Sequence, residues 1–304
     1  MSAYLSTLPG AVAQGLIWGM MAIGVYITFK ILDLADLTVD GSICTGASVC
    51  AILVVNGTNV YLALLLAFLA GLLAGMLTGV FHIVLGIPAI LSGILTQLML
   101  YSINLKIMQK SNITVSARNF KVVLTQLRIP ESLLILALVS AALVALLYLF
   151  FGTEIGCAIR ATGSNAAMSR AQSINTNFTK MIGLALSNGI VALSGALLCQ
   201  YQGFSDINMG RGAIVIGLAA VIIGEAVISK IGRNFAVRLV GVLIGAVIYY
   251  FVYQTVIFLG IDTDLLKMLS ALVVALFLGA PYVKSHYFPK TASAGKKGKG
   301  DGNA

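Results

Sequence analysis

Residues 131–171 read ESLLILALVSAALVALLYLFFGTEIGCAIRATGSNAAMSRA, and this stretch decides the class of fold. Its first half, 131–151, carries no charge after Glu131 and has the length of about 20 residues that crosses a hydrocarbon core as a helix. Its second half changes abruptly to small, polar and basic residues. The pattern predicts a membrane-crossing helix that is followed by a loop at the membrane surface.

The same apolar character extends over nearly the whole chain. Hydrophobic residues make up 59% of the 304 positions and charged residues 10%, whereas soluble domains have about 45–50% and about 25%. Apolar windows lie approximately at 11–32, 40–55, 60–86, 88–108, 131–151, 178–200, 212–229, 235–259 and 265–283. We therefore predict an all-α polytopic membrane protein with about nine transmembrane helices over 1–283 and a basic, disordered tail over 284–304. The short window 40–55 contains Gly41 and Gly46, which predicts a broken or closely packed helix.

Small residues recur at close spacing within the apolar windows. The groups are Gly71, Gly75 and Gly79, then Gly241 and Gly245, and then Ser194, Gly195 and Ala196. Such residues let helix backbones approach closely in lipid, where no hydrophobic effect drives association. The sequence thus predicts a compact bundle of helices, which is typical of transporters and channels.

The distribution of basic residues predicts the orientation. The basic residues of three loops fall on one side of the membrane: Arg160, Arg170, Lys180, Lys230, Arg233 and five lysines after residue 283. The positive-inside rule predicts that this side is cytoplasmic, with the C-terminus inside and the N-terminus outside. The basic stretch 106–128 then falls outside. Either a hidden extra segment within 33–108 puts the N-terminus inside, or this external loop contacts an acidic partner.

The loop 152–180 is the longest that we predict on the cytoplasmic side. Ser164 is a residue type that caps helices, so we expect a short helix from Asn165 to about Ser173. The small side chains of Ala166, Ala167 and Ser169 leave its backbone accessible for docking. Nucleic-acid binding is excluded despite the net charge of +9, because no folded basic domain presents the charge.

The same loop carries a resemblance to a known family. Gly156, Arg160, Ala161, Gly163 and Asn165 fit the order G-x-x-x-R-A-x-G-x-N, and the spans that follow and the segment 31–42 continue the likeness. The chain resembles the permeases of ABC importers of the branched-chain amino acid and ribose type. The resemblance implies that 163–173 is a cytoplasmic coupling helix in a groove of an ATPase subunit. The residues to which it assigns ATPase coupling are Arg160, Gly163, Ser164, Asn165, Ala166, Met168, Ser169 and Arg170.

Further expectations follow from the resemblance. The chain contains no G-x-x-x-x-G-K-[ST], so we expect a non-catalytic subunit, with ATP and magnesium bound by a partner ATPase. The other expected partners are an extracellular solute-binding protein or lipoprotein and a second permease copy in a homodimer, all at a bacterial cytoplasmic membrane. The sequence at 35–42 looks closest to permeases for aromatic amino acids, which favours an amino acid as the solute. A sugar or nucleoside ABC importer, and an ATP-independent secondary transporter or channel, remain alternatives.

Polar residues within the spans are the candidates for a translocation pathway, because such groups are costly in lipid and face a cavity or a partner. The candidates are Ser42, Thr45, Ser48, Ser92, Thr96, Gln97, Ser187, Asn188, Ser194 and Gln200. We expect most of them to form interhelical hydrogen bonds.

The remaining ionisable groups are given structural roles. We expect Glu225 to pair with Lys230 or Arg233, and Asp33, Asp36 and Asp40 to share one face of a helix. The cysteines lack metal-ligating spacing, so we interpret them as small hydrophobic residues and predict no metal. They are Cys44, Cys50, Cys157 and Cys199.

Overall fold

The computed structural model describes residues 2–116, 120, 122–228, 234–259 and the single positions 268, 271, 272, 275 and 279. These residues are almost entirely helical, as a chain must be where lipid cannot satisfy backbone N–H and C=O groups. The helices are α1 (Ser2–Tyr26), α2 (Val39–Val55), α3 (Val60–Gly79), α4 (Ala89–Met108), α5 (Ile129–Gly152), α6 (Glu154–Ser164), α7 (Ala166–Ala171), α8 (Thr176–Gln202), α9 (Ala213–Ile228) and α10 (Phe235–Phe258). Short turns extend them as η1 (Ile27–Ile31), η2 (Val80–Val84) and η3 (Gln126–Arg128).

Six helices of the described residues are long and apolar enough to cross a membrane. They cover Thr7–Ile31, Val60–Val84, Ala89–Met108, Gln126–Gly152, Thr176–Gln202 and Phe235–Phe258. The predicted windows 40–55 and 212–229 form the shorter apolar helices α2 and α9. The predicted count of nine spans is therefore not confirmed. Most of the window 265–283, and all of the tail 284–304, lie outside the described residues.

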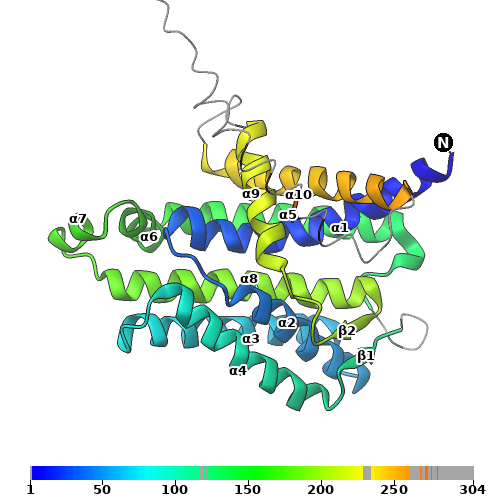
Figure 1. Ribbon diagram of the computed structural model, residues 1–304, viewed down its shortest axis with the longest axis horizontal. Coiled ribbons are helices and arrows are strands. Elements are labelled where there is room, and N and C mark those ends of the chain that lie inside the picture. The colour runs from blue at the N-terminus through cyan, green and yellow to red at the C-terminus, as the bar shows by residue number, and fades with distance from the viewer. Residues whose placement is uncertain are drawn as a thin grey trace, which may run out of the picture.

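The two ends of the bundle are different. Figure 1 shows α6 and α7 at one end, and the N-terminus and a small sheet at the other. In the sheet, β1 (Asn112–Thr114) pairs antiparallel with β2 (Phe204–Asp206), so that Asn112 lies opposite Asp206. Residues 33–108, all of which are described, form only α2, α3 and α4 with η2, and no hidden span. The stretch that contains β1 thus lies at the end opposite α7, on the same side as the N-terminus.

The helices α1 and α8 form the centre of the bundle. Within their most apolar windows 78% and 83% of residues are buried, compared with 28% for α4 and 22% for α5. Side chains such as Leu138 and Leu146 of α5 point outward and suit contact with lipid. Of the cysteines, Cys157 is exposed and the other three are buried, as expected of small hydrophobic residues.

Glycines allow the central helices to touch backbone to backbone. A Cβ atom on Gly46 of α2 would overlap the Ala192 carbonyl of α8, and one on Gly195 of α8 would overlap the Ile43 carbonyl of α2. Gly75 of α3 meets Leu184 of α8 in the same manner. The predicted close packing at small residues is confirmed.

A buried polar cluster joins α2 and α8 through Asn188. Its Nδ2 donates to Asp36 Oδ2 at 2.7 Å and to the Leu184 carbonyl at 3.0 Å, while its Oδ1 accepts from Ser42 Oγ at 2.6 Å. The Asp36 carboxyl also accepts from the backbone N–H of Thr38 at 2.9 Å. All of these side chains are buried, so the cluster ties the non-helical segment 32–38 to the centre of the bundle.

The prediction that Asp33, Asp36 and Asp40 share one helical face is wrong. The helix ends after Ile31, and Asp33 adopts a φ of 55°, which leaves the right-handed helical region. Asp36 lies in the non-helical connection, and Asp40 is the second residue of α2. The three carboxyl groups therefore lie in three different local environments.

Candidate functional site

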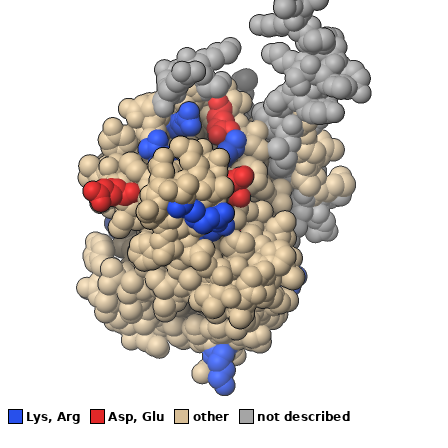
Figure 2. All heavy atoms as spheres, turned by 90° about the vertical axis from the view of Figure 1, so that its left-hand side faces the viewer, with Lys and Arg blue, Asp and Glu red and all other residues tan. Residues whose placement is uncertain are grey.

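The helices α6 and α7 form the polar end of the bundle. Thr153 starts α6 because its Oγ1 accepts from the N–H of Gly156 at 3.3 Å. Asn165 starts α7, with its Oδ1 accepting from the N–H of Met168 at 3.0 Å. Figure 2 looks onto this end and shows Lys, Arg, Asp and Glu side chains gathered on it. A charged end face of this kind suits contact with water or with another protein.

The predicted cap of the short helix is corrected. Ser164 is the last residue of α6, so its backbone is not free to adopt the extended conformation that an N-cap needs. Asn165 has that conformation, with φ −158° and ψ 98°, and it separates the two helices. The helix also ends at Ala171, two residues before the predicted end.

The eight predicted coupling residues divide into two groups. Two hold α6 to the bundle, because the Arg160 guanidinium lies 5.6 Å from the centre of the Phe235 ring and Gly163 packs against the Ile31 backbone. A third, Ser169, is buried and donates within α7 to the Asn165 carbonyl. The others are Ser164, Asn165, Ala166, Met168 and Arg170. Ala166 is partly buried and the remaining four are exposed, with Met168 at 59%. An exposed, unbranched apolar side chain on a short helix is suited to insertion into a groove.

A cationic hollow lies beside α6. It has a volume of about 410 Å³ and is lined in part by Tyr26, Lys30, Arg160 and Arg238. Lys30 Nζ lies 2.8 Å from Glu225 Oε2, and both side chains are a little over one third exposed. Glu225 thus pairs with Lys30 of η1. The two partners expected from the sequence, Lys230 and Arg233, lie outside the described residues, so that expectation stays a prediction.

Nine of the ten predicted pathway residues are buried and hydrogen bonded. The bonds that Asn188 donates are those of the polar cluster described above. The other eight side chains donate as follows: Ser42 to Asn188, Thr45 to the Gly41 carbonyl, Ser48 to the Met108 sulfur, Ser92 to the Pro88 carbonyl, Thr96 to the Ser92 carbonyl, Ser187 to the Gly24 carbonyl, Ser194 to the Ile17 carbonyl and Gln200 to the Cys50 sulfur. Gln97, in contrast, is partly exposed and lines a cavity.

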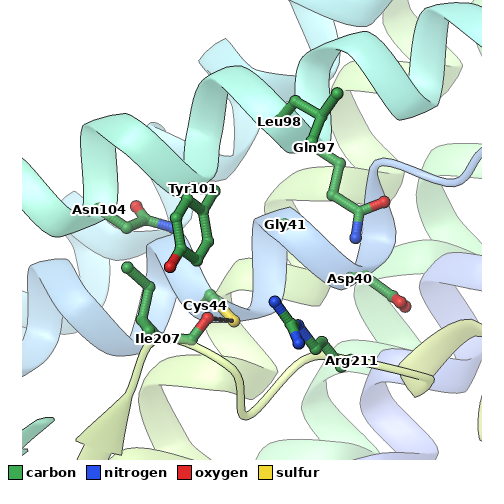
Figure 3. Close-up of a pocket in the computed structure, with 9 residues that line it drawn as sticks. All are labelled: Asp40, Gly41, Cys44, Gln97, Leu98, Tyr101, Asn104, Ile207 and Arg211. Atoms are coloured by element: carbon green, nitrogen blue, oxygen red, sulfur yellow. Dashed lines mark hydrogen bonds between the residues drawn. The ribbon is translucent and has the colours of Figure 1, made fainter. Parts of the chain in front are cut away.

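That cavity lies between α2, α4 and the connection from β2 to α9. Its volume is about 320 Å³, and its lining residues are Asp40, Gly41, Cys44, Gln97, Leu98, Tyr101, Asn104, Ile207 and Arg211. Figure 3 shows Asn104 and Tyr101 toward one end of the group and Asp40 toward the other, with the Arg211 guanidinium reaching into the space between Cys44 and Gln97. Cys44 Sγ donates to the Ile207 carbonyl at 3.3 Å, and this bond holds the connection from β2 to α9 against α2.

The Asp40 carboxylate holds the two short helices together. Its Oδ2 accepts from the N–H of Gly212 and its Oδ1 from the N–H of Ile214, both at 2.9 Å. These N–H groups belong to the start of α9, where helices leave donors without partners and carry partial positive charge. The starts of α2 and α9 therefore meet at the cavity, a geometry that transporters with discontinuous helices use for solutes.

Comparison with known proteins identifies the family. The model of the branched-chain amino acid transport system permease component matches residues 8–278. The chain belongs to this family. It is an ABC-type permease and a multi-pass membrane protein. Within the described residues this permease shows no group of His, Cys, Asp and Glu that could hold a metal ion.

Individual relatives resemble the permease over different lengths. It is 41% identical to the tyrosine transport system permease protein of Clostridioides difficile, over 90% of this chain and 91% of that protein. It is 32% identical to an uncharacterized protein of Rickettsia prowazekii, over 91% and 98% of the two chains. The ribose import permease protein of Escherichia coli is 30% identical over 42% of this chain and 39% of its own. No solved structure matches the permease significantly.

Sequence reasoning missed most of the cavity in this permease. Tyr101, Asn104 and Arg211 were not among the predicted pathway residues. A signal was present, because Gln97, Tyr101 and Asn104 follow one another at intervals of four and three residues and so lie on one face of α4. Arg211 lies in the Gly210–Gly212 stretch before an apolar span, where charge alone does not reveal which residues it faces.

Proposed function

We propose that this permease is the transmembrane subunit of an ABC importer that moves an amino acid of the aromatic class inward by alternating access. The single observation that carries the proposal is the 41% identity, over nine tenths of the chain, to a protein named as a tyrosine transport permease. The likeness to the ribose import permease extends over only 42% of the chain, which favours the amino acid over the sugar.

The proposed partners follow from the two different ends of the bundle. An ATPase subunit binds α6 and α7 at the cytoplasmic side of a bacterial inner membrane, with Met168 and Arg170 at the contact, and it supplies ATP and magnesium. An extracellular binding protein delivers the solute at the end with β1 and β2. A second permease copy completes the pathway, and the C-terminus lies in the cytoplasm.

Reconstitution tests the function directly. The permease, its ATPase and its binding protein are placed in liposomes, and uptake of labelled L-tyrosine and D-ribose is measured with and without internal ATP. We expect uptake of L-tyrosine that requires ATP. Uptake of ribose alone would favour the sugar alternative, whereas uptake driven by an ion gradient without the ATPase would show a secondary transporter.

The docking of the ATPase is tested with a matched pair of variants. Met168→Glu places a charge at the position of an exposed apolar side chain of α7. Leu127→Glu does so in η3, which precedes the end of α5 opposite to α6, and Leu127 is 67% exposed. Burying a charge in an apolar contact is costly. We expect Met168→Glu to weaken co-purification of the ATPase at least about tenfold, which corresponds to about 1.4 kcal/mol, and Leu127→Glu to leave it unchanged. Equal recovery with both variants would contradict docking at α7.

A further inference from the structure

We propose that the cavity between α2, α4 and the β2–α9 connection is a solute-recognition site for an α-amino acid with a hydroxylated aromatic side chain. The inference deepens the proposed import function and depends on it. It starts from Asn104, which is fully buried and lines the cavity, and whose Oδ1 and Nδ2 have no hydrogen-bond partner among the described residues. A buried amide without partners is destabilising. Such a group persists where a ligand uses it.

The opposite end of the cavity supplies charge of both signs. The Arg211 guanidinium reaches into the space beside Cys44 and Gln97, and it forms no ion pair within the described part of the chain. Asp40 also lines the cavity, with its carboxylate held against the start of α9. A free guanidinium matches a carboxylate with two parallel hydrogen bonds. A cation and an anion at one end of a cavity complement the carboxylate and ammonium groups of an amino acid.

Between the two ends the wall is apolar and aromatic. Leu98, Tyr101 and Ile207 line it, and Gly41 lets the α2 backbone approach. An aromatic ring in contact with Tyr101 gains stabilisation beyond its buried area. With the charged groups of the solute at Arg211 and Asp40, its ring lies along this wall and its hydroxyl group reaches Asn104. The volume of about 320 Å³ suits a solute of this size.

The place of the cavity in the bundle fits a solute that arrives from outside. Asn104 lies four residues before the end of α4, at the end of the bundle that carries β1. The starts of α2 and α9 form the inner boundary. The solute therefore enters from the side of the small sheet and stops where the short helices begin.

Two variants test the two ends of the site in the reconstituted transporter. Asn104→Leu keeps the number and branching of the side-chain heavy atoms but cannot bind a hydroxyl group, so we expect L-tyrosine uptake to fall about tenfold while L-phenylalanine uptake is maintained. Arg211→Gln removes the charge that holds the carboxylate, so uptake of both amino acids should fall by about tenfold or more. Arg128→Gln, an exposed arginine at the same end that pairs with Glu131, is the matched control and should transport normally.

A measurement on the unaltered complex needs no variant. We expect L-tyrosine to raise the midpoint of thermal unfolding of the permease–ATPase complex without binding protein, and L-phenylalanine, tyramine and 3-(4-hydroxyphenyl)propionate to raise it less. Equal shifts with all four compounds, or an unchanged tyrosine to phenylalanine ratio in Asn104→Leu, would overturn the site while ATP-driven tyrosine uptake still stood. A transporter that imports only ribose would refute the proposed function itself.

Discussion

Asparagine at position 188 gives the sharpest prediction about stability. We replace it with leucine, which has the same number and branching of side-chain heavy atoms but cannot form hydrogen bonds. The change removes the 2.7 Å bond to the Asp36 carboxyl and the 2.6 Å bond from Ser42, and it leaves both partners buried. The segment 32–38 then loses its side-chain link to α8.

The magnitude follows from the groups left without partners. Interhelical hydrogen bonds in membrane proteins contribute about 0.6 kcal/mol on average, but an unsatisfied buried group costs about 1–3 kcal/mol, and more when it is a carboxylate. Two such groups, less about 1 kcal/mol gained from the added apolar surface of leucine, give a loss of about 1–5 kcal/mol in the free energy of unfolding. At about 2–4 °C per kcal/mol for a chain of this size, the midpoint of thermal unfolding should fall by roughly 2–20 °C.

The cysteines of the chain report the unfolding. A thiol-reactive dye reacts with Cys157 in the folded protein and with the buried Cys44, Cys50 and Cys199 only when the bundle opens. Asn104→Leu is the matched control, because Asn104 is equally buried but has no hydrogen-bond partner among the described residues, so its midpoint should stay the same or rise. Equal midpoints for the two leucine variants would refute the reasoning, since the hydrogen bonds at Asn188 would then contribute nothing.

Two further predictions concern packing and charge. Gly46→Ala places a methyl group into the Ala192 carbonyl and should cost about 1–3 kcal/mol, measured by the same dye, whereas Gly152→Ala, which meets nothing within 4 Å, should change stability by less than about 1 kcal/mol. Glu225→Gln breaks a pair with Lys30 in which both side chains are more than one third exposed, so it should lower stability by no more than about 1 kcal/mol without loss of uptake. A variant that is stable but cannot transport would instead give Glu225 a role in transport.

The sequence predicts the long helices well because lipid imposes a simple length and polarity rule. The apolar window 131–151 became α5 almost residue for residue, and the short window 40–55 became the short helix α2. Breaks within the membrane are harder to predict. The chain leaves the helix after Ile31 although the residues that follow include Leu32 and Leu34. The tertiary hydrogen bond from Asn188 to Asp36, together with the local one from the Thr38 N–H, stabilises the non-helical segment. A pattern of three aspartates at helical spacing is therefore misleading there.

The two buried asparagines show where prediction of the site stops. Asn104 and Asn188 both lie in apolar spans. Asn104 shares one face of α4 with Gln97 and Tyr101, but this spacing alone does not separate a helix-packing residue from a solute-binding one. The difference arises from partners that are distant in the chain: Asp36 and Ser42 converge on Asn188, whereas an open cavity lies beside Asn104. In a membrane, where each polar group must find a partner, a group whose needs are met within the fold supports structure. The group that lacks one is the place to look for the solute.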